Sequence, residues 1–419
     1  MSKLKAIVIG AGQRGNAYAA YALDHPEAIQ FVGVAEPHER RRNDFAEKYG
    51  IDETDCLHTW EDIFTRDKWA DAVFICNQDR QHYGPTMAAI AKGYDILLEK
   101  PASPEPKECL EMAEAAEKAG VKVVVCHVMR YTPFATRIKE IIDSGEIGEI
   151  MSIVHNENVG DIHQSHSFVR GNWSVTKESA PMILAKSCHD LDMLQWLLGT
   201  KCKSLSSYGA LSFFYAGNRP AAAPPRCIDG CPADCPYDSR KLYLDNSKAS
   251  NWFRSVAAGY DYPSDEDVEA ALRTGPYGRC VFQCGNDVVD HQVVSMLFEN
   301  DVTVLFSMSG FTPDTSRSIK IMGTKGQIKA HTSDKNIKVY NFVTRTEREI
   351  DISSTGGHGG GDTGIIASFI NYLQGNADPN ISGMRISAEN HMLAFAAEDS
   401  RLKGGALATF GEDSSYSLL

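Results

Sequence analysis

The stretch Leu4–Leu23, LKAIVIGAGQRGNAYAAYAL, decides the fold. It begins with a short apolar run rich in Ile and Val, which predicts a buried β-strand because it is too short for a helix. Glycines in the spacing GxGxxG follow at Gly10, Gly12 and Gly15. One permits a tight turn, one lets the backbone approach a pyrophosphate, and one lets a helix pack closely on the strand. We therefore predict a dinucleotide-binding strand–turn–helix, with Gln13 and Arg14 in its phosphate loop.

The second predicted strand, residues 29–36 (IQFVGVAE), ends in Glu36. A carboxylate at this strand end accepts hydrogen bonds from the adenosine ribose hydroxyls and repels a 2′-phosphate, so it favours NAD over NADP. Arg40, Arg41 and Arg42 follow closely and could hold a 2′-phosphate. The sequence thus predicts NAD and leaves NADP open.

Strands and helices continue to alternate up to residue 126. We expect strands at 71–77, 94–101 and 121–128, and helices at 85–93 and 105–119. Such alternation predicts a doubly wound parallel sheet, a Rossmann domain over residues 1–126, whose ligand lies at the carboxyl ends of the strands. Polar residues expected at these ends, and assigned to cofactor binding, are Glu36, Asn77, Glu99 and Lys100.

The pattern changes in residues 127–419. Longer alternating strands appear, for instance at 150–159, and hairpins are expected to turn at Asn300-Asp301 and at 324–326. Hairpins after βα units predict an α+β domain with an open, mainly antiparallel sheet. Because an open apolar face needs a cover, we expect a homodimer or homotetramer.

Residues 214–285 read as an insertion rich in Pro, Gly, Asn and Cys, with one short helix between Ser264 and Gly275. Its cysteines are Cys227, Cys231, Cys235, Cys280 and Cys284. The Cys227/Cys231/Cys235 spacing is not that of a standard zinc site, so we expect reduced thiols that pack the insertion and keep structural zinc as the alternative. We interpret the insertion as a lid or an oligomer element.

Several motifs occur in one order along the chain: the glycine loop, Glu99-Lys100-Pro101, Arg130-Tyr131-x-Pro133, and His189-x-x-Asp192 before Trp196-Leu197-Leu198-Gly199. This set resembles the Gfo/Idh/MocA oxidoreductases, which are nicotinamide-dependent dehydrogenases of sugars, inositols and related polyols. The resemblance covers nearly the whole chain except the insertion. It implies the same two-domain fold, dimers or tetramers formed through the open sheet, and a site between the domains.

Individual residues match the family's functional positions. The resemblance implies that Lys100 reaches both the nicotinamide ribose and a substrate hydroxyl, that His189 is catalytic, and that His82 lies near the nicotinamide. One position departs from the family, which often has an aspartate four residues before the histidine. Here that residue is Ala185, with Lys186 beside it.

The segment 185–199, AKSCHDLDMLQWLLG, carries the expected proton chemistry. Hydride can leave a carbinol carbon only if a base with a suitable pKa takes the hydroxyl proton. We assign this role to His189 and Lys100, with Lys186 as a further cation and Asp192 orienting the imidazole. The alternative is structural: a core histidine, and a Lys186–Asp190 salt bridge one helical turn apart.

The substrate wall and a metal site are less defined by sequence. Arg130, Tyr131, Trp173 and His358 are our candidates for the wall, although Trp173 equally suits core packing and His358 lies in a glycine-rich stretch that equally suits a connector. Upstream of the catalytic segment lie Asp161 and the histidines His155, His163 and His166. Their spacing fits no standard zinc pattern, so the metal content stays unknown.

We predict hydride transfer between the carbinol carbon of a sugar, glycoside or polyol and NAD(P). The alternatives are a redox-neutral enzyme that cleaves glycosides through a keto-sugar on bound NAD, and a non-enzymatic NAD-binding regulator. The net charge of −13 argues against nucleic acid and anionic membranes as partners. With no signal-peptide pattern and no apolar run of about 18 residues, we expect a cytoplasmic protein.

Overall fold

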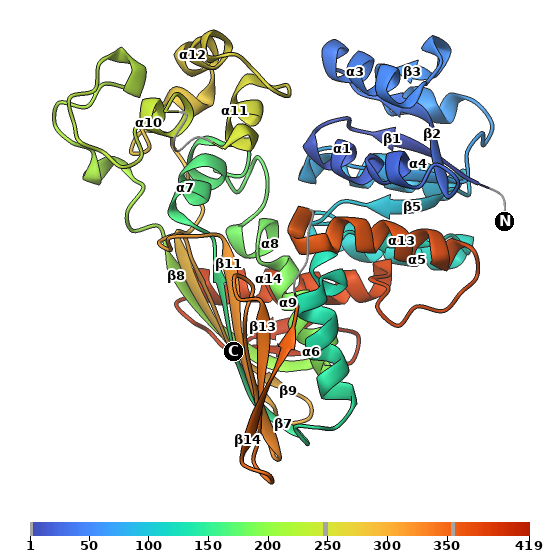
Figure 1. The fold of residues 1–419 in the computed structure, drawn as a ribbon, viewed down its shortest axis with the longest axis vertical. Helices are drawn as coiled ribbons and strands as arrows, with labels where there is room; N and C mark the ends of the chain where they lie inside the picture. Colours follow the sequence, from blue (N-terminus) through green and yellow to red (C-terminus); the bar gives the residue numbers. More distant parts are fainter. Residues whose placement is uncertain (1–2, 246–249, 353–356) are drawn as a thin grey trace.

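The computed structural model describes residues 3–245, 250–352 and 357–419. Its N-terminal part contains a parallel sheet in the order β3-β2-β1-β4-β5-β6, drawn in blue and cyan in Figure 1. The strands are β1 (Leu4–Ile9), β2 (Ile29–Ala35), β3 (Cys56–Leu57), β4 (Ala72–Ile75), β5 (Asp95–Leu98) and β6 (Val123–Val125). This order reverses direction at β1, so the glycine loop after β1 lies at the switch point of the sheet, where such folds bind ligands.

Helices cover both faces of this sheet. They are α1 (Gln13–Ala19), α2 (Tyr21–Asp24), α3 (Glu39–Tyr49), α4 (Tyr83–Ala91) and α5 (Pro106–Ala119). Alternate residues of β1 divide between the two cores, with Ile7 on the α4–α5 side and Val8 on the other. A strand buried on both faces explains the continuous apolar run of the sequence. The predicted doubly wound sheet is confirmed.

A helix from far along the chain completes one face of the first sheet. In α13 (Gly361–Leu373), Ile365, Ile366 and Phe369 are buried together with Val8 and Phe74. The rings of Phe74 and Phe369 meet edge to face with centroids 5.8 Å apart. The expected boundary at residue 126 stays a prediction, and the structure adds that the chain returns to the first domain after residue 360.

The second sheet runs in the order β14-β13-β12-β11-β7-β10-β9-β8-β15-β16, and it is antiparallel except between β7 and β10. Its strands are β7 (Ile150–Asn158), β8 (Cys202–Ala210), β9 (His291–Phe298), β10 (Thr303–Ser309), β11 (Ser316–Gly323), β12 (Gly326–His331), β13 (Asn336–Asn341), β14 (Thr346–Asp351), β15 (Ala408–Phe410) and β16 (Tyr416–Leu418). The predicted α+β domain and both predicted hairpins are confirmed.

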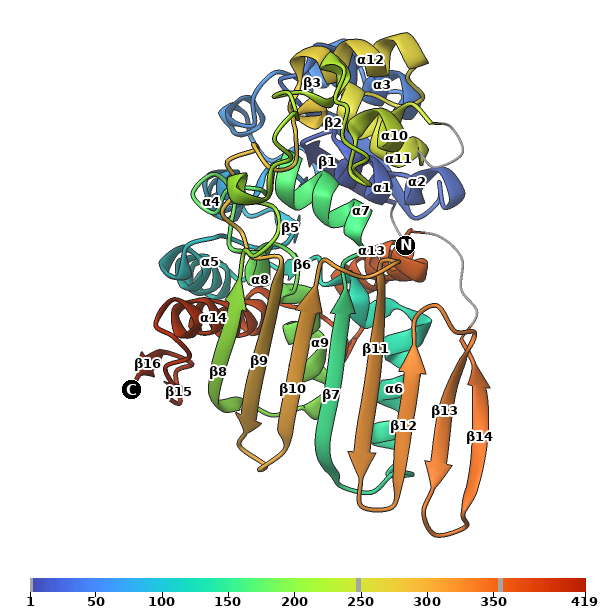
Figure 2. The same ribbon diagram turned by 90° about the vertical axis from the view of Figure 1, so that its left-hand side faces the viewer.

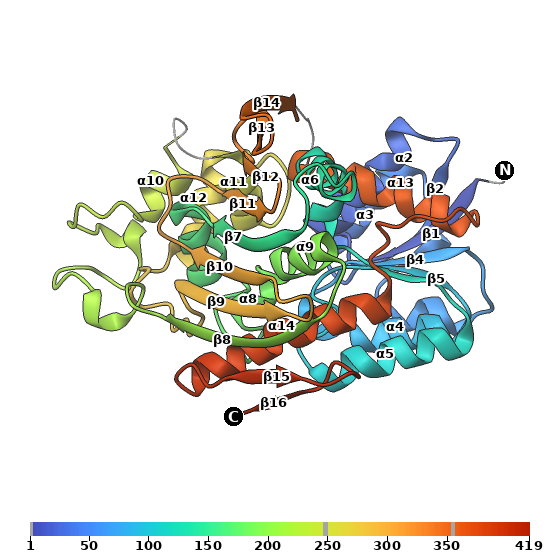
Figure 3. The same cartoon turned by 90° about the horizontal axis from the view of Figure 1, so that it is seen from below.

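One face of this sheet is covered by helices and the other is open. Figure 2 shows the open face towards the viewer, with α6 (Pro133–Asp143) and α9 (Cys188–Leu198) behind it. In Figure 3, α9 and α14 (Met384–Leu402) lie between the sheet and the N-terminal domain. No helix in the described ranges is both long and apolar enough to cross a bilayer.

The insertion is more helical than the sequence suggested. The helix α12 (Asp265–Thr274) begins at the expected cap, Ser264, which exchanges hydrogen bonds with Asp267 in a capping box. Two more helices, α10 (Ser239–Tyr243) and α11 (Asn251–Ala258), accompany it, so the expectation of one short helix was wrong. Both are too short to be stable alone. They form because their apolar residues share a small core with α12.

Candidate active site

The glycine loop is shaped for close packing at two positions and for a ligand at the third. Gly10 has φ +89°, and a Cβ on it would lie 2.8 Å from the backbone nitrogen of Asn77. A Cβ on Gly15 would lie 2.2 Å from the carbonyl oxygen of Gly10. A Cβ on Gly12 would meet nothing within 4 Å, although this residue precedes the uncapped N-terminus of α1. The loop therefore leaves open space beside free backbone N–H groups, as a pyrophosphate requires.

Two acceptors at neighbouring strand ends also fit a dinucleotide. The buried Glu36 carboxylate accepts hydrogen bonds from the backbone nitrogens of Ala11 and His38, each at 2.9 Å, and these bonds hold it beside the loop. Its oxygens keep free lone pairs for ribose hydroxyls. The buried Oδ1 of Asn77 has no hydrogen-bond partner among the described residues. An orphaned buried acceptor is costly unless a ligand or water satisfies it, so the residues present fit the cofactor that the sequence predicted.

Arg14 links the glycine loop to α13. Its Nε lies 2.7 Å from Glu99 Oε1 and its Nη2 lies 2.7 Å from Asp362 Oδ1, while Nη2 also donates to the hydroxyl of Tyr18. Burial alone would raise the pKa of Glu99, but Arg14 and Lys100 hold it below its ordinary value. Arg14 and Glu99 thus form an ionised bridge beneath the loop, and direct contact of either with the cofactor stays a prediction.

Both ring nitrogens of His82 lie within hydrogen-bond distance of backbone carbonyl oxygens. It is fully buried, with Nδ1 2.7 Å from the carbonyl oxygen of Pro101 and Nε2 3.0 Å from that of Asn77. Because both ring nitrogens are used, His82 positions the loops after β4 and β5 against each other. Direct contact of His82 with the cofactor stays a prediction.

Lys100 reaches from the first domain to the catalytic segment. Its Nζ donates a 2.8 Å hydrogen bond to the carbonyl oxygen of Ala185, the last residue of α8 (Met182–Ala185). Burial lowers the pKa of His189 well below its ordinary value, and the neighbouring cation of Lys100 lowers it further. The structure therefore brings Lys100, Ala185 and His189 together, and the catalytic roles that the resemblance implies for Lys100 and His189 stay predictions.

Lys186 belongs to the same group. Burial lowers its pKa, and Arg317 and Lys100 add to this effect against the opposing charge of Glu157. Its Nζ lies 3.4 Å from Glu157 Oε1. The alternative Lys186–Asp190 salt bridge is wrong, because Lys186 precedes the first turn of α9 and the helical spacing does not apply to it.

A buried charged cluster supports this segment from the sheet. Arg317 on β11 donates from Nε to Asp190 Oδ1 at 2.8 Å and from Nη2 to Glu157 Oε1 at 2.7 Å. Asp190 also contacts His155 Nε2 at 2.6 Å, and these partners hold its pKa far below the usual range despite burial, which opposes them. The cluster fixes the start of α9 on β7 and β11.

Asp192 does not orient His189, contrary to expectation. Its carboxylate forms two 2.6 Å hydrogen bonds with Arg130 and accepts another from Asn390, and all these groups are buried. The Nδ1 of His189 is buried with no hydrogen-bond partner in the described part of the chain. The guanidinium of Arg130 takes both carboxylate oxygens because it needs a counter-ion in the protein interior.

The same ion pair removes Arg130 from the proposed substrate wall. Arg130 is 2% exposed and faces Asp192, while the hydroxyl of Tyr131 donates to the carbonyl oxygen of Asn380 at 3.0 Å. Burial raises the pKa of Tyr131 to about 12. Arg130 therefore does not form the wall as expected, whereas Tyr131 is half-buried and its contact with substrate stays a prediction.

Aromatic rings connect the catalytic group to the insertion. Trp173 donates from Nε1 to the buried carboxylate of Asp79 at 3.1 Å, and its ring lies 6.2 Å from that of Phe168. The ring of His163 lies 5.7 Å from Phe168 and 5.6 Å from Trp252 on α11. Burial lowers the pKa of His163 well below its ordinary value, and Lys186 and Lys100 contribute, so His163 lies near the lysines.

Sequence reasoning missed Asp79, His163 and Trp252 as site residues. Asp79 follows Asn77 closely at a strand end, so its position carried a usable signal. His163 was considered only as a metal ligand, and among the described residues no group of three or more His, Cys, Asp or Glu side chains is arranged to hold a metal. Trp252 lies in the insertion, where no pattern pointed to it.

His358 lies within the expected glycine-rich loop, residues 356–361, of which Gly356 falls outside the described residues. It has φ +48°, and its Nδ1 lies 3.0 Å from Asp362 Oδ1. Its ring centroid lies 6.3 Å from that of His189. The structure thus places His358 beside the catalytic group, between it and the Arg14 bridge, and its contact with substrate stays a prediction.

Comparison with protein families agrees with this geometry. Residues 4–127 match the model described as "Oxidoreductase family, NAD-binding Rossmann fold", and residues 139–385 match that of the family's C-terminal alpha/beta domain. The chain is a Gfo/Idh/MocA family oxidoreductase. Its first domain is accordingly the NAD-binding domain of this family, and the predicted resemblance is confirmed.

Individual relatives of this Gfo/Idh/MocA oxidoreductase are distant. YteT of Bacillus subtilis, which is named as an oxidoreductase, is 26% identical over 70% of each chain. The scyllo-inositol 2-dehydrogenase (NAD(+)) of the same species is 25% identical over 66% of this chain and 69% of its own. An inositol dehydrogenase homologue from Azotobacter vinelandii, solved with NAD+, superposes with a TM-score of 0.70 over 98% of each chain, at 14% identity.

Proposed function

We propose that the protein oxidises a carbinol carbon of a sugar, glycoside or polyol with NAD as the hydride acceptor. The observation that carries this is the bond from Lys100, at the cofactor end of the first sheet, to Ala185 in the segment that also holds Lys186 and His189. Relatives named as inositol dehydrogenases support the substrate class. Glu36, Gly12 and Asn77 would hold the cofactor, which supplies a hydride-accepting carbon when bound.

We propose Lys186 as the proton acceptor, in place of His189 and Lys100, which the sequence suggested for this role. A general base works best when its pKa lies near the working pH. The surroundings lower the pKa of Lys186 from an ordinary value that is too high, whereas they lower the pKa of His189 away from neutrality. We propose that Lys186, whose Nζ lies 3.4 Å from Glu157 Oε1, takes the hydroxyl proton, and that His189 holds the hydroxyl by a hydrogen bond. Lys100, fixed on the carbonyl of Ala185, orients the substrate oxygen.

This assignment also gives a role to the position at which the chain departs from its family. The aspartate often found at position 185 is absent, and the carbonyl of Ala185 accepts from Lys100 instead. Lys186, supported by Glu157, supplies the titratable group that the aspartate would have supplied. Substrate rings are expected to stack on Trp173 and Trp252, since sugar faces pack well on aromatic side chains.

The test is a panel of sugars, glycosides and polyols incubated with NAD+ or NADP+, followed by absorbance of the reduced nicotinamide and by product mass. Oxidised product with matching NADH supports the proposal. Cleaved glycoside without net NADH would replace it by the redox-neutral reaction. Cofactor binding without turnover across the panel would replace it by a regulatory role.

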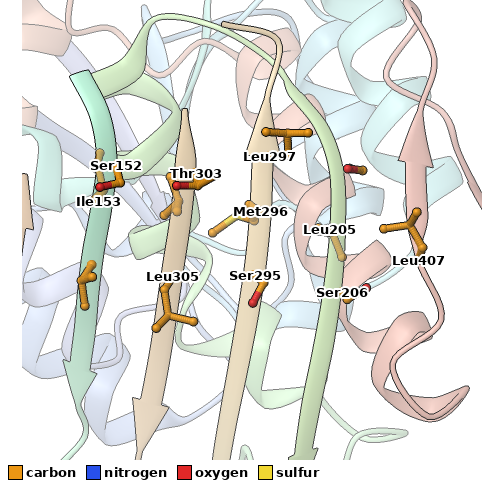
Figure 4. Close-up of a pocket in the computed structure, with 13 residues that line it drawn as sticks. Ser152, Ile153, Leu205, Ser206, Ser295, Met296, Leu297, Thr303, Leu305 and Leu407 are labelled. Carbon is orange, nitrogen blue, oxygen red and sulfur yellow. The ribbon is translucent and has the colours of Figure 1, made fainter. Parts of the chain in front are cut away.

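We also propose that a second copy of the chain covers the open face of the second sheet. A shallow groove of about 400 Å³ crosses β7, β10, β9 and β8 and ends at Leu407; Figure 4 shows its lining of serine, threonine and aliphatic side chains. No charged residue lines it, and Leu305 on this face is 42% exposed. Such a face suits a self-complementary dimer contact.

We propose the cytoplasm as the compartment. All cysteines of the chain fall within the described ranges, and each is an unpaired thiol. The five cysteines of the insertion are buried or half-buried there, and Cys280 and Cys284 pack with Phe214 and Tyr237. Thiols that pack in this way suit a reducing environment.

A further inference from the structure

The insertion makes contact with the cofactor domain through a short segment between α11 and α12, residues 259–262, which we name the strap. The Nε of Arg41 donates a 3.1 Å hydrogen bond to the carbonyl oxygen of Gly259. The guanidinium of Arg40 lies over the ring of Tyr260, 3.7 Å from its centroid. Figure 1 shows α11 and α12 on the side of the second domain that faces α3, the helix that carries both arginines.

The two arginines occupy a position that matters for cofactor choice. They follow Glu36, whose carboxylate stands where a dinucleotide fold binds the adenosine ribose. An arginine near this point normally accommodates the 2′-phosphate of NADP. Here Arg40 is stacked on Tyr260, Arg41 is bonded to Gly259, and the buried Arg42 donates to the carbonyl oxygen of Glu36 at 2.7 Å. Each of these three arginines is thus engaged by the protein.

Contacts within the insertion fix the position of the strap. The helix α11 ends at Gly259, which has φ +88° and turns the chain towards α3. Beyond the strap, Arg254 donates to the carbonyl oxygen of Pro263 at 3.3 Å and to Asp265 Oδ1 at 2.6 Å. These bonds join the start of α12 to α11. The segment that carries Tyr260 is therefore fixed at both of its ends.

We propose that the strap is a specificity and retention element for the nicotinamide cofactor. It withdraws Arg40 and Arg41 from a 2′-phosphate and thereby favours NAD, and it joins the insertion to the domain that binds the cofactor and so slows cofactor release. This rests on the proposed function, since it needs a dinucleotide at the glycine loop. The strap would be absent from relatives that lack the insertion, so its effect is particular to chains built like this one.

The experiment measures binding and needs no substrate. NADH release is followed by stopped-flow fluorescence, and NADPH affinity by titration, in Tyr260→Ala, Arg40→Ala and the double variant. Tyr262→Ala is the matched control, because Tyr262 is an aromatic residue of the same segment that is 84% exposed. An exposed cation–π contact predicts NADH release about two- to fivefold faster in each single variant, with no further increase in the double variant.

NADPH separates the strap from a general loosening of the fold. Tyr260→Ala frees Arg40, so NADPH should bind about 10- to 100-fold more tightly, by the worth of one hydrogen bond to a charged group. Arg40→Ala removes that cation and should give no such gain. An unchanged rate of NADH release in Tyr260→Ala and Arg40→Ala, or the same change in NADPH affinity in both, would overturn the proposed role of the strap and leave the proposed function standing. A wild-type protein that binds no NADH would instead overturn the proposed function, and the strap with it.

Discussion

Replacing Asp192 tests whether this residue is structural, as its contacts indicate, or catalytic, as its spacing from His189 suggested. The Arg130–Asp192 pair has side chains only 3% and 0% exposed, with two 2.6 Å hydrogen bonds. Asp192→Ala leaves the guanidinium buried without its counter-ion, which costs about 3–5 kcal/mol. For a domain of about 290 residues, that corresponds to a melting temperature lower by about 5–8 °C.

The assay is urea and thermal denaturation, combined with turnover measured well below the transition. Asp192→Asn keeps much of the hydrogen bonding and should retain kcat within about threefold, since Asp192 does not touch His189. Arg130→Met combined with Asp192→Leu should recover much of the lost stability. The surface pair Arg137–Glu140 is the control, and Glu140→Ala should change stability by less than about 1 kcal/mol. An Asp192→Ala protein as stable as wild type but without activity would refute the reasoning.

Three further predictions concern the loop, pH and assembly. Gly12→Val should fold normally but lose NADH binding, because its side chain enters open space, whereas Gly15→Ala should lower the melting temperature because its Cβ meets the Gly10 carbonyl. Burial lowers the pKa of His127 to about 4, below its value of about 6.5 in the unfolded chain. As the pH falls, the unfolded chain therefore binds this proton first, and the free energy of unfolding decreases between about pH 6.5 and 4. His127→Leu should reduce the slope of the unfolding free energy against pH by up to the contribution of one proton, and an unchanged slope would contradict this prediction. Leu305→Arg should convert the proposed dimer to a monomer in light scattering, and an unaltered mass would exclude this face.

Local sequence patterns predicted the fold well, because they act over short distances. Strand periodicity and helix-ending glycines such as Gly120 report burial and backbone geometry directly, and the hairpin at Asn300-Asp301 follows from turn chemistry. The packing of α13 on the first sheet could not be predicted in this way. Its apolar residues indicate that it is buried but not which sheet it meets, and Phe369 reaches Phe74 across most of the chain.

The sequence predicted that Lys100 and His189 lie together, but it did not predict the residues that hold them in place. Motif order identified Lys100 and His189, which the structure brings together. Helical spacing suggested that Asp192 faces His189, but the electrostatic need of a buried arginine outweighs such a spacing argument. Arg317 binds Asp190 from a strand far along the chain, and no local signal encodes that pairing. The strap on Arg40 depends likewise on the folded position of the insertion.

The most direct test of the account is single-turnover reduction of bound NAD+ by a substrate found in the panel, compared between wild type and Lys186→Met. Lys329→Met, on the exposed side of β12, is the control. If Lys186 is the proton acceptor, its replacement should slow the hydride step by about 10²–10⁴-fold, with the Kd for NADH nearly unchanged. A Lys186→Met protein that reduces NAD+ within about threefold of the wild-type rate would contradict the assignment of proton transfer to Lys186.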